Sequence, residues 1–337
     1  MSTFLFLLFP KKQPGGVLPS QRYLHTVTLI DNNLYIIGGQ YLTDTSIEII
    51  GKEFICLDVS NPFNTWELSW ENLTDINMVP PHIGAASAQS VANMFLYGGI
   101  STNNDEKDLV YIFDTRGNST NSWITLNAIG KTNKAFLTSI DNDGKITDYG
   151  AVLLPNKNII YLGGSIINNE PLTLNEVYLY DTIQDNWSIK TTSGYIPSRR
   201  FAFSAVLSLD GQKIIIFGGK WTTNLTALYE LDLTNFNWYI PKVSGQIQDP
   251  RYWHKANVIG KYMVISFGCC YDQSIESDIL LLDISNDQEY VWTTNFEPHL
   301  PSPLPTQVPT QEVISLRPFP SSAVLSPIMG TSITVFY

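Results

Sequence analysis

Charged residues, cysteines and long hydrophobic runs are all scarce in this chain. Charged side chains make up 15% of the 337 residues, well below the roughly 25% that is usual for soluble domains. The three cysteines, Cys56, Cys269 and Cys270, are an odd number without CxxC spacing. No segment reaches the roughly 18 uninterrupted apolar residues of a membrane helix. These shortages argue against a disulfide framework, a cysteine-bound metal and a helical membrane protein.

Basic residues are also few, and the common enzyme motifs are missing. The 20 Lys and Arg against 31 Asp and Glu give a net charge of −11, whereas nucleic-acid-binding proteins usually present a basic face. No glycine-rich phosphate loop, GxSxG elbow or HExxH motif is present. Asp141-Asn142-Asp143-Gly144 resembles the start of a calcium loop, but Val152 stands where the bidentate acid is needed. The sequence therefore predicts no cofactor, no metal and no nucleic-acid partner.

What the chain has in abundance is an apolar strand that ends in a glycine pair. This strand occurs five times, with first glycines at 38, 98, 163, 218 and 268, which are 50 to 65 residues apart. The five endings are Gly38-Gly39, Gly98-Gly99, Gly163-Gly164, Gly218-Gly219 and Gly268-Cys269, in which cysteine replaces the second glycine. Glycines allow positive φ where a chain leaves a crowded strand. The spacing predicts a repeat architecture.

An aspartate and a tryptophan follow each glycine pair in the same order. The next apolar strands end in Asp58, Asp114, Asp181, Asp232 and Asp283, and the tryptophans are Trp66, Trp123, Trp187, Trp238 and Trp292. We expect the aspartate to hydrogen-bond the turn that follows it, and the tryptophan to be buried between neighbouring units. Short polar turns such as Asp210-Gly211 between apolar runs predict β-hairpins.

Together these marks resemble the kelch-repeat family over residues 21–296. The resemblance implies an all-β fold, a β-propeller of four-stranded antiparallel blades, in which five repeats are recognisable and the ring has five or six blades. The strand before each glycine pair is apolar on both faces, as expected for a sheet between two neighbours. Each repeat begins with its own first strand and ends at its own tryptophan, so closure through a shared blade is not predicted.

The segments that flank the repeats differ in composition. Residues 1–20 contain the apolar run Phe4–Phe9, which resembles a degenerate secretion signal but lacks a preceding basic residue. Residues 297–337 form a Pro-, Ser- and Thr-rich tail, read as a stalk, a disordered segment, a short final strand at Ser332–Tyr337 or a clipped membrane anchor. These ends favour an extracellular or membrane-tethered location over the cytoplasm. The four glycosylation sequons, at Asn72, Asn118, Asn186 and Asn224, are no more than chance gives in an Asn-rich chain.

The enzyme alternative is a copper radical oxidase resembling galactose oxidase, whose catalytic domain is also built of kelch repeats. Such a site needs two histidines and two tyrosines around copper. His25 and His254 stand in matching Arg-x-x-His motifs of repeats one and five, but they do not assemble a paired His/Tyr motif. We therefore expect hydrogen-bonded histidines near the central channel, and no enzyme activity. Carbohydrate binding belongs to the same alternative class.

The favoured function is a scaffold that binds a protein or peptide through loops on one propeller face. Tyr41, Trp221 and Tyr271 follow the glycine pairs and are candidate contact anchors, with packing on a neighbouring hairpin as the alternative. Arg22, Arg200 and Arg251 match in position, so symmetry predicts a cationic ring that selects an acidic motif. The alternative is that each arginine braces an inter-blade loop. A membrane partner is expected only if an end segment tethers the chain.

Overall fold

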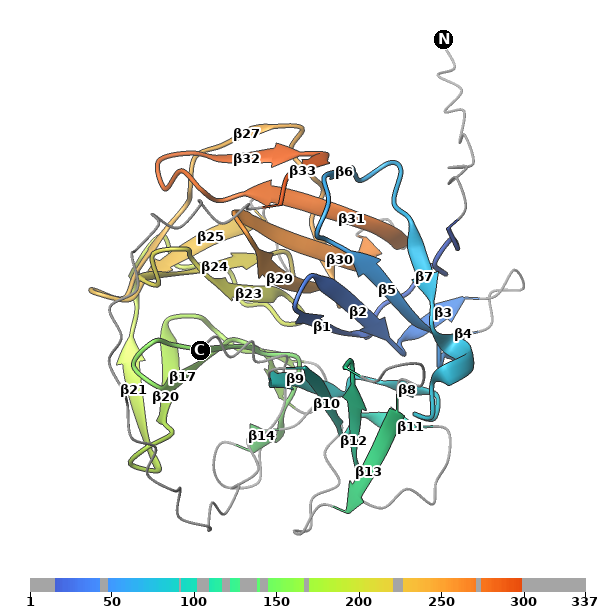
Figure 1. The fold of residues 1–337 in the computed structure, drawn as a ribbon. Coiled ribbons are helices and arrows are strands. Elements are labelled where there is room, and N and C mark those ends of the chain that lie inside the picture. The colour runs from blue at the N-terminus through green and yellow to red at the C-terminus, as the bar shows by residue number, and fades with distance from the viewer. Residues whose placement is uncertain are drawn as a thin grey trace, which may run out of the picture.

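The chain folds as an all-β propeller. A computed structural model describes residues 16–42, 48–90, 92–101, 109–116, 122–127, 138–139, 145–166, 170–220, 227–270 and 274–298. In this part of the chain the one helix is the short 3-10 turn η1 (Thr74–Ile76), and none could cross a membrane. Five antiparallel sheets fan around a central axis, each as one blade (Figure 1).

Each blade comes from one repeat and runs from an inner to an outer strand. Blade 1 holds β1 (Thr26–Ile30), β2 (Asn33–Ile37), β5 (Phe54–Asp58) and β7 (Trp70–Asn72). Blade 2 holds β9 (Ala86–Ser90), β10 (Asn93–Tyr97), β12 (Leu109–Asp114) and β13 (Ser122–Asn127). Blade 3 holds β16 (Gly150–Leu153), β17 (Asn158–Leu162), β20 (Glu176–Asp181) and β21 (Asn186–Thr191).

Blades 4 and 5 gain a fifth strand from the segment that precedes them. Blade 4 holds β23 (Ser204–Leu207), β24 (Lys213–Phe217), β25 (Leu228–Asp232), β26 (Asn237–Tyr239) and the parallel outer strand β22 (Ser193–Gly194). Blade 5 holds β29 (Lys255–Ile259), β30 (Tyr262–Cys270), β31 (Ile275–Asp283), β32 (Tyr290–Thr293) and the parallel outer strand β27 (Val243–Gly245). Within blade 5, β28 (Arg251–Tyr252) also pairs with β30.

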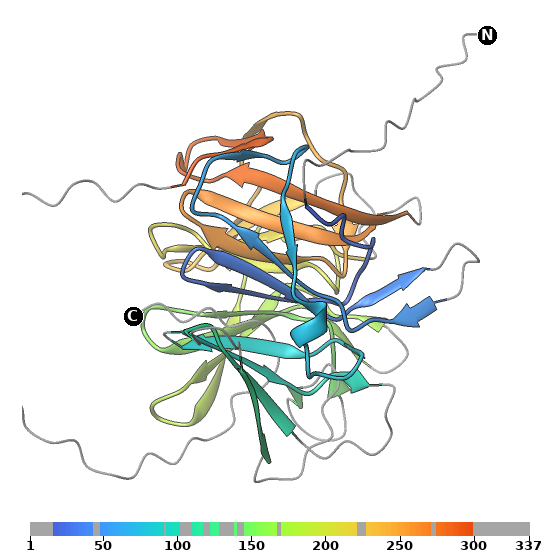
Figure 2. The same ribbon diagram turned by 45° about the vertical axis from the view of Figure 1, so that its right-hand side comes forward.

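Short strand pairs complete the fold. They are β3 (Gln40–Leu42) with β4 (Glu48–Ile50), β8 (His82–Ile83) with β11 (Ile100–Ser101), β14 (Thr138–Ser139) with β15 (Lys145–Ile146), β18 (Ser165–Ile166) with β19 (Glu170–Pro171), and β6 (Phe63–Asn64) with β33 (Asn295–Phe296). The β3–β4 hairpin follows the first glycine pair and projects away from blade 1 (Figure 2, blue arrows at the right). We call the side of the propeller on which the chain leaves each glycine pair the glycine-loop face.

The aspartate that ends each third strand has the predicted role. Its Oδ1 accepts the backbone N–H two residues later in all five repeats, as for Asp58 with Ser60 at 2.7 Å and Asp283 with Ser285 at 2.9 Å. This side-chain bond closes the turn that leads to the fourth strand.

The glycine pairs also adopt the predicted backbone, but the fifth pair is shifted by one residue. The first glycines have φ of 53° to 71° and the second glycines φ of 90° to 102°. In blade 5 these conformations belong to Phe267 (φ 52°) and Gly268 (φ 107°). The assignment of Gly268-Cys269 as the fifth pair was therefore wrong. Phenylalanine replaces the first glycine, and Cys269 pairs with Tyr252 as Gln40 does with Tyr23.

A backbone collar links the blades around the axis. In every repeat the second residue after the arginine position has positive φ, between 53° and 64°. In four of the five repeats the N–H of this residue donates to the carbonyl of its counterpart in the preceding blade. The bonds are Gly84 to Leu24 (2.9 Å), Leu24 to Trp253 (3.1 Å), Trp253 to Ala202 (2.9 Å) and Ala202 to Asp148 (2.8 Å). A second series joins the second glycine of a blade to the arginine position of the next: Gly39 to His82 (2.9 Å), Gly164 to Arg200 (3.2 Å), Gly219 to Arg251 (2.9 Å) and Gly268 to Arg22 (2.9 Å).

Four hydrophobic clusters fill four of the five junctions between blades. They join blades 1 and 2, 3 and 4, 4 and 5, and 5 and 1. Trp123, Trp238 and Trp292 are buried in three of them, as the sequence predicts. Trp66 instead lies on the surface, 55% exposed, and Trp70 of β7 fills its place against Phe267.

The junction between blades 5 and 1 closes the chain on itself. Besides its shared core, it has the collar bond from Leu24 and the short pair β6–β33, where the rings of Phe63 and Phe296 stack at 4.5 Å. Blades 5 and 1 thus meet by the same contacts as blades that are consecutive in sequence.

Among the described residues, the junction between blades 2 and 3 lacks the contacts that join the other blades, and we call it the open junction. Within the described residues neither series of backbone bonds crosses it, and no contact between β9 and β16 matches those of the other inner strands. The cluster on this side of blade 3 contains only residues from that repeat, and Trp187 is 45% exposed. These two blades flank the lower side of the view in Figure 1. The 22 residues between β13 and β16 are fewer than half of one repeat interval, so they cannot supply a sixth blade.

Replacing Gly38 by alanine should destabilise the propeller by about 2 kcal/mol, because positive φ and a steric contact add up. Gly38 has φ of 68°, and a Cβ there would lie 2.7 Å from the carbonyl oxygen of His82 in the next blade. Gly211→Ala is the control. It has a similar φ of 71°, but its nearest neighbour is a Pro155 side-chain atom at 3.2 Å, so about 1 kcal/mol is expected. Urea unfolding measures both, and equal losses would contradict the role of the His82 carbonyl.

Candidate functional site

Within the described residues, the glycine-loop face consists of the base from which its loops extend, which we call its floor. The loops that follow the glycine pairs, at 43–47, 102–108, 167–169, 221–226 and 271–273, lie outside the described residues, and Trp221 and Tyr271 lie within them. With the fifth pair at Phe267-Gly268, Tyr271 stands three residues past the pair rather than two. The geometry of the face is therefore built from the residues beneath these loops.

Arg22 and Arg251 are buried and paired with carboxylates. Arg22 is 1% exposed, donates to the Gly38 carbonyl at 3.2 Å and forms an ion pair with Glu53. Burial lowers the Arg22 pKa to about 10. Arg251 is 5% exposed and binds Asp278 at 2.7 Å. Each of these two arginines therefore has a carboxylate partner in its own repeat, as expected if the arginines brace inter-blade loops.

Arg200 is also buried, but carbonyl oxygens surround it. It is 0% exposed and donates to the carbonyls of Gly218 at 3.0 Å and Ser198 at 3.1 Å, with its guanidinium 4.8 Å from the centre of the Tyr229 ring. The three arginines do occupy equivalent positions, as symmetry predicts. Their guanidinium groups hold the backbone of the glycine pairs and do not form an exposed ring.

His25 and His254 each bridge two blades. Nε2 of His25 is 2.8 Å from the Ser266 hydroxyl of blade 5, and Nε2 of His254 is 2.8 Å from the Ser204 hydroxyl of blade 4. Burial lowers the pKa of His25 well below its usual value and that of His254 to about 3, assisted by nearby cationic side chains. His82, at the arginine position of repeat two, is also buried with a lowered pKa. The histidines are therefore neutral structural groups near the channel.

Tyr41 lies on the β3–β4 hairpin and packs on it. A Cβ added to Gly51 would lie 2.9 Å from a Tyr41 ring carbon, so the ring covers Gly51. Tyr41 is half-buried. Tyr41 therefore packs within its own hairpin rather than on a neighbouring one.

An aromatic shelf lies at the floor of the face between blades 1 and 5. Tyr23 and Trp253 stack with ring centres 5.3 Å apart, and Tyr252 meets Trp253 edge-on at 5.0 Å. The Lys220 ammonium of blade 4 lies 5.1 Å from the Trp253 ring and 5.4 Å from the Tyr252 ring. Tyr252, Trp253 and Lys220 are all partly exposed. The shelf offers a rigid apolar surface with one cation beside it.

A carboxyl and a second lysine lie next to this shelf. Burial raises the pKa of Asp148 on the collar, while the charges of Lys255 and Lys220 oppose the rise. Burial lowers the pKa of Lys255, and the Asp148 charge opposes that fall. Asp148 and Lys255 therefore stabilise each other's charged forms against the cost of burial, and Lys220 lies close enough to act on the Asp148 carboxyl as well.

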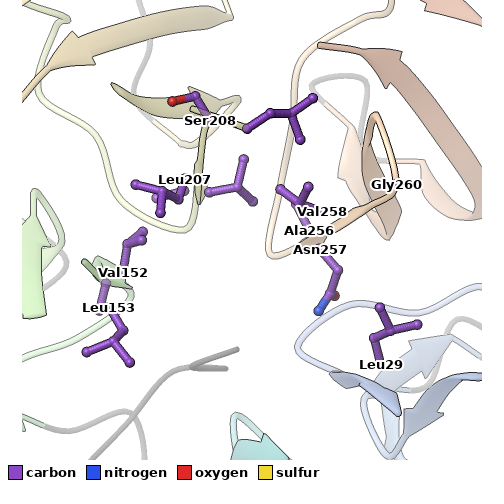
Figure 3. Close-up of a pocket in the computed structure, with 13 residues that line it drawn as sticks. Leu29, Val152, Leu153, Leu207, Ser208, Ala256, Asn257, Val258 and Gly260 are labelled. Atoms are coloured by element: carbon purple, nitrogen blue, oxygen red, sulfur yellow. The ribbon is translucent and has the colours of Figure 1, made fainter. Parts of the chain in front are cut away.

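A separate concavity lies at the other end of the inner strands. It has a volume of about 410 Å³ and is lined mainly by aliphatic side chains from β1, β16, β23 and β29 (Figure 3). Asn257 and the Ser208 hydroxyl are the polar groups among its labelled lining residues. Among the residues that the structure describes, no three metal-ligating side chains come together here or elsewhere.

Sequence reasoning missed the shelf, the Asp148–Lys255 pair and this concavity. A signal for the shelf was present, because Tyr23 and Tyr252 directly follow Arg22 and Arg251 in the Arg-x-x-His motifs. Lys220 directly follows a glycine pair. The concavity has no comparable signal, since it is formed by ordinary strand residues from four repeats.

Arg200→Ala should lower the free energy of unfolding by about 3 kcal/mol, because one buried and one partly buried carbonyl lose their donor and a buried side chain leaves a cavity. Arg199→Ala is the matched control. Arg199 is adjacent but 59% exposed, and its pair with Glu170 is 3.9 Å long, so a change below about 1 kcal/mol is expected. Chemical denaturation compares the two. A small loss for Arg200→Ala would return this arginine to the list of ligand-binding candidates.

His254 should make the fold less stable as the pH falls from 6.5. The folded state keeps His254 neutral down to a pKa of about 3, whereas the unfolded chain takes up a proton near pH 6.5, so about 1.4 kcal/mol is lost per pH unit. Unfolding measured at pH 7, 6 and 5 should show a shallower dependence for His254→Gln than for the unaltered chain. The aspartates with lowered pKa, such as Asp58, lose stability only at lower pH. Equal slopes would contradict the buried, neutral histidine.

Comparison with known proteins places these repeats in a family. Residues 149–308 match the model of the KLHDC2/KLHL20/DRC7 Kelch-repeats domain. Human host cell factor 2 is 35% identical over 109 residues, 30% of this chain and 14% of that protein. Arabidopsis thaliana acyl-CoA-binding domain-containing protein 4 is 24% identical over 260 residues, 76% of this chain and 36% of that protein. Human kelch domain-containing protein 3 is 29% identical over 137 residues, 37% of this chain and 34% of that protein.

Among solved structures, that of YjhT aligns with a TM-score of 0.44 and 14% identity, covering 81% of this chain and 84% of its own. The chain spans about a third or less of the length of these curated relatives. The match to the family model over residues 149–308, the similarity to kelch-containing proteins and the five-bladed arrangement together show that this chain contains kelch repeats that form a β-propeller.

Proposed function

We propose that this chain is a scaffold that binds a protein or peptide at its glycine-loop face. The observation that carries the proposal is the aromatic shelf of Tyr23, Tyr252 and Trp253 with Lys220 beside it. Propellers of this family commonly serve as protein-interaction scaffolds, and rigid aromatic side chains beside a cation are typical binding hot spots.

The shelf also suggests what the ligand presents. Arg22 and Arg251 are already paired with Glu53 and Asp278, so they do not attract an acidic motif. Lys220 has no carboxylate within ion-pair distance among the described residues. An apolar or aromatic side chain on the rings, followed by an acidic residue at Lys220, would fit this arrangement.

A displayed random-peptide library selected on the full chain tests the proposal. Selected peptides should bind Trp253→Ala at least about 30-fold more weakly, because truncation of a central aromatic anchor costs 2 kcal/mol or more. Lys220→Glu should weaken peptides that contain an acidic residue more than neutral ones. Tyr195→Ala is the control, since Tyr195 is 69% exposed and directly follows β22, the outermost strand of blade 4.

Circular dichroism must first show that each variant remains folded. Selected peptides that bind Trp253→Ala and Lys220→Glu as tightly as the unaltered chain would contradict this face as the binding site. The oxidase alternative has less support, because the Nε2 atoms of His25 and His254 are taken by serine hydroxyls in different junctions. Peroxide release from galactose by the copper-loaded chain would revive it.

A further inference from the structure

The innermost strands of four blades carry aliphatic side chains at one level, at the end of these strands away from the glycine-loop face. In each blade, the innermost-strand residue that pairs with the second residue of the next strand lies at this level. These residues are Leu29, Leu153, Leu207 and Val258, with Gln89 in blade 2. The four aliphatic side chains, which we call the aliphatic lining, are partly exposed and all border the concavity of about 410 Å³ (Figure 3).

The size and charge of this concavity limit what can occupy it. Its volume falls within the range of roughly 300 to 1,000 Å³ that is typical of sites for small molecules. Among the described residues that line it, none is charged. Burial of an ionised group there would cost free energy, because no opposite charge would compensate it. The concavity therefore suits a neutral molecule with a mainly aliphatic body.

Asn257 on β29 is a polar side chain in this lining that lacks a partner. It is 5% exposed, and its side chain forms no hydrogen bond with the described residues. Its amide points toward Leu29 of blade 1 beside the concavity (Figure 3). The other polar side chain in the lining is already engaged, since the Ser208 hydroxyl donates to Asp210 at 2.5 Å. Because an unpaired buried amide costs free energy, a hydrogen bond from a ligand to Asn257 is favourable.

The backbone of the same strands adds neutral hydrogen-bonding groups. Each of β1, β16, β23 and β29 pairs with a single neighbouring strand of its sheet, so its other edge faces the channel. A strand at the edge of a sheet presents unpaired N–H and C=O groups. A ligand that carries a hydroxyl or carbonyl group therefore finds neutral partners here, in addition to the Asn257 amide.

We propose that this concavity binds a small neutral molecule that has a compact aliphatic body and one hydroxyl or carbonyl group. The body packs on the aliphatic lining, and the polar group bonds to the Asn257 amide. The aromatic shelf lies at the other end of the inner strands, at Tyr23, Tyr252 and Trp253. The ligand is therefore distinct from the peptide proposed for the glycine-loop face, and either proposal can fail without the other.

Ligand-observed NMR of the full chain with millimolar menthol tests the proposal, and p-menthane, which lacks the hydroxyl, is the matched probe. Menthol should bind and raise the melting temperature, because a ligand of the folded state stabilises it. Asn257→Leu, which is close in shape, should weaken menthol about fivefold through the loss of one hydrogen bond and should not weaken p-menthane.

A variant that fills the concavity gives the second readout. Leu207→Trp should abolish binding of both probes, because the larger side chain occupies the space. Ile183→Trp is the control, since Ile183 is 76% exposed on the turn between β20 and β21, and it should bind both probes like the unaltered chain. Leu29→Trp fills the concavity from blade 1 and replaces Leu207→Trp if that variant does not unfold cooperatively.

Four results would overturn the proposal. The full chain could fail to bind menthol, or the filled variant could bind it as tightly as the unaltered chain, which would place the probe elsewhere. Asn257→Leu could keep its full affinity for menthol, which would remove the polar contact. Menthol binding that appears only after deletion of residues 299–337 would show that the chain's own C-terminal residues occupy the concavity.

Discussion

The fold depends on one backbone constraint, a residue of positive φ at the same place in every repeat. In every repeat except the third, the N–H of this residue binds the carbonyl of the equivalent residue in the preceding blade. Glycine adopts it without cost only in blade 2, while Leu24, Asp148, Ala202 and Trp253 adopt it against their intrinsic preference. The hydrogen bonds and the packing between blades hold these residues there. The register of each blade relative to the next follows from this shared geometry.

Most of the architecture could be predicted from local marks. Glycine pairs, terminal aspartates and hairpin turns act within a few residues of their own position, so their sequence pattern carries their structure. The apolar strands between these marks show which segments of the sequence form the blades. The failure at Gly268 has a physical reason, because Phe267 adopts the positive φ of a first glycine and is held there by its buried ring. A pattern based on glycine alone cannot recognise that substitution.

The site was harder to predict because it depends on burial. Arg22, Arg200 and Arg251 match in position, and only the structure shows that carbonyls and acids enclose them. Trp66 and Trp70 are four residues apart, and spacing could not decide which one packs. The open junction had a faint signal in its 65-residue interval between first glycines. A longer interval looks in sequence like a longer loop.

The contacts between blades 5 and 1 make the propeller independent of which blade comes first in the sequence. Gly268 bonds Arg22, and Leu24 bonds Trp253, by the same rules that join repeats adjacent in sequence. The junction between the first and last blades therefore cannot be told from the other packed junctions by its contacts. A circular permutant that joined residues after β33 to those before β1, and began instead between blades 2 and 3, would keep all four packed junctions. In such a molecule the discontinuity of the polypeptide and the discontinuity of the propeller would coincide.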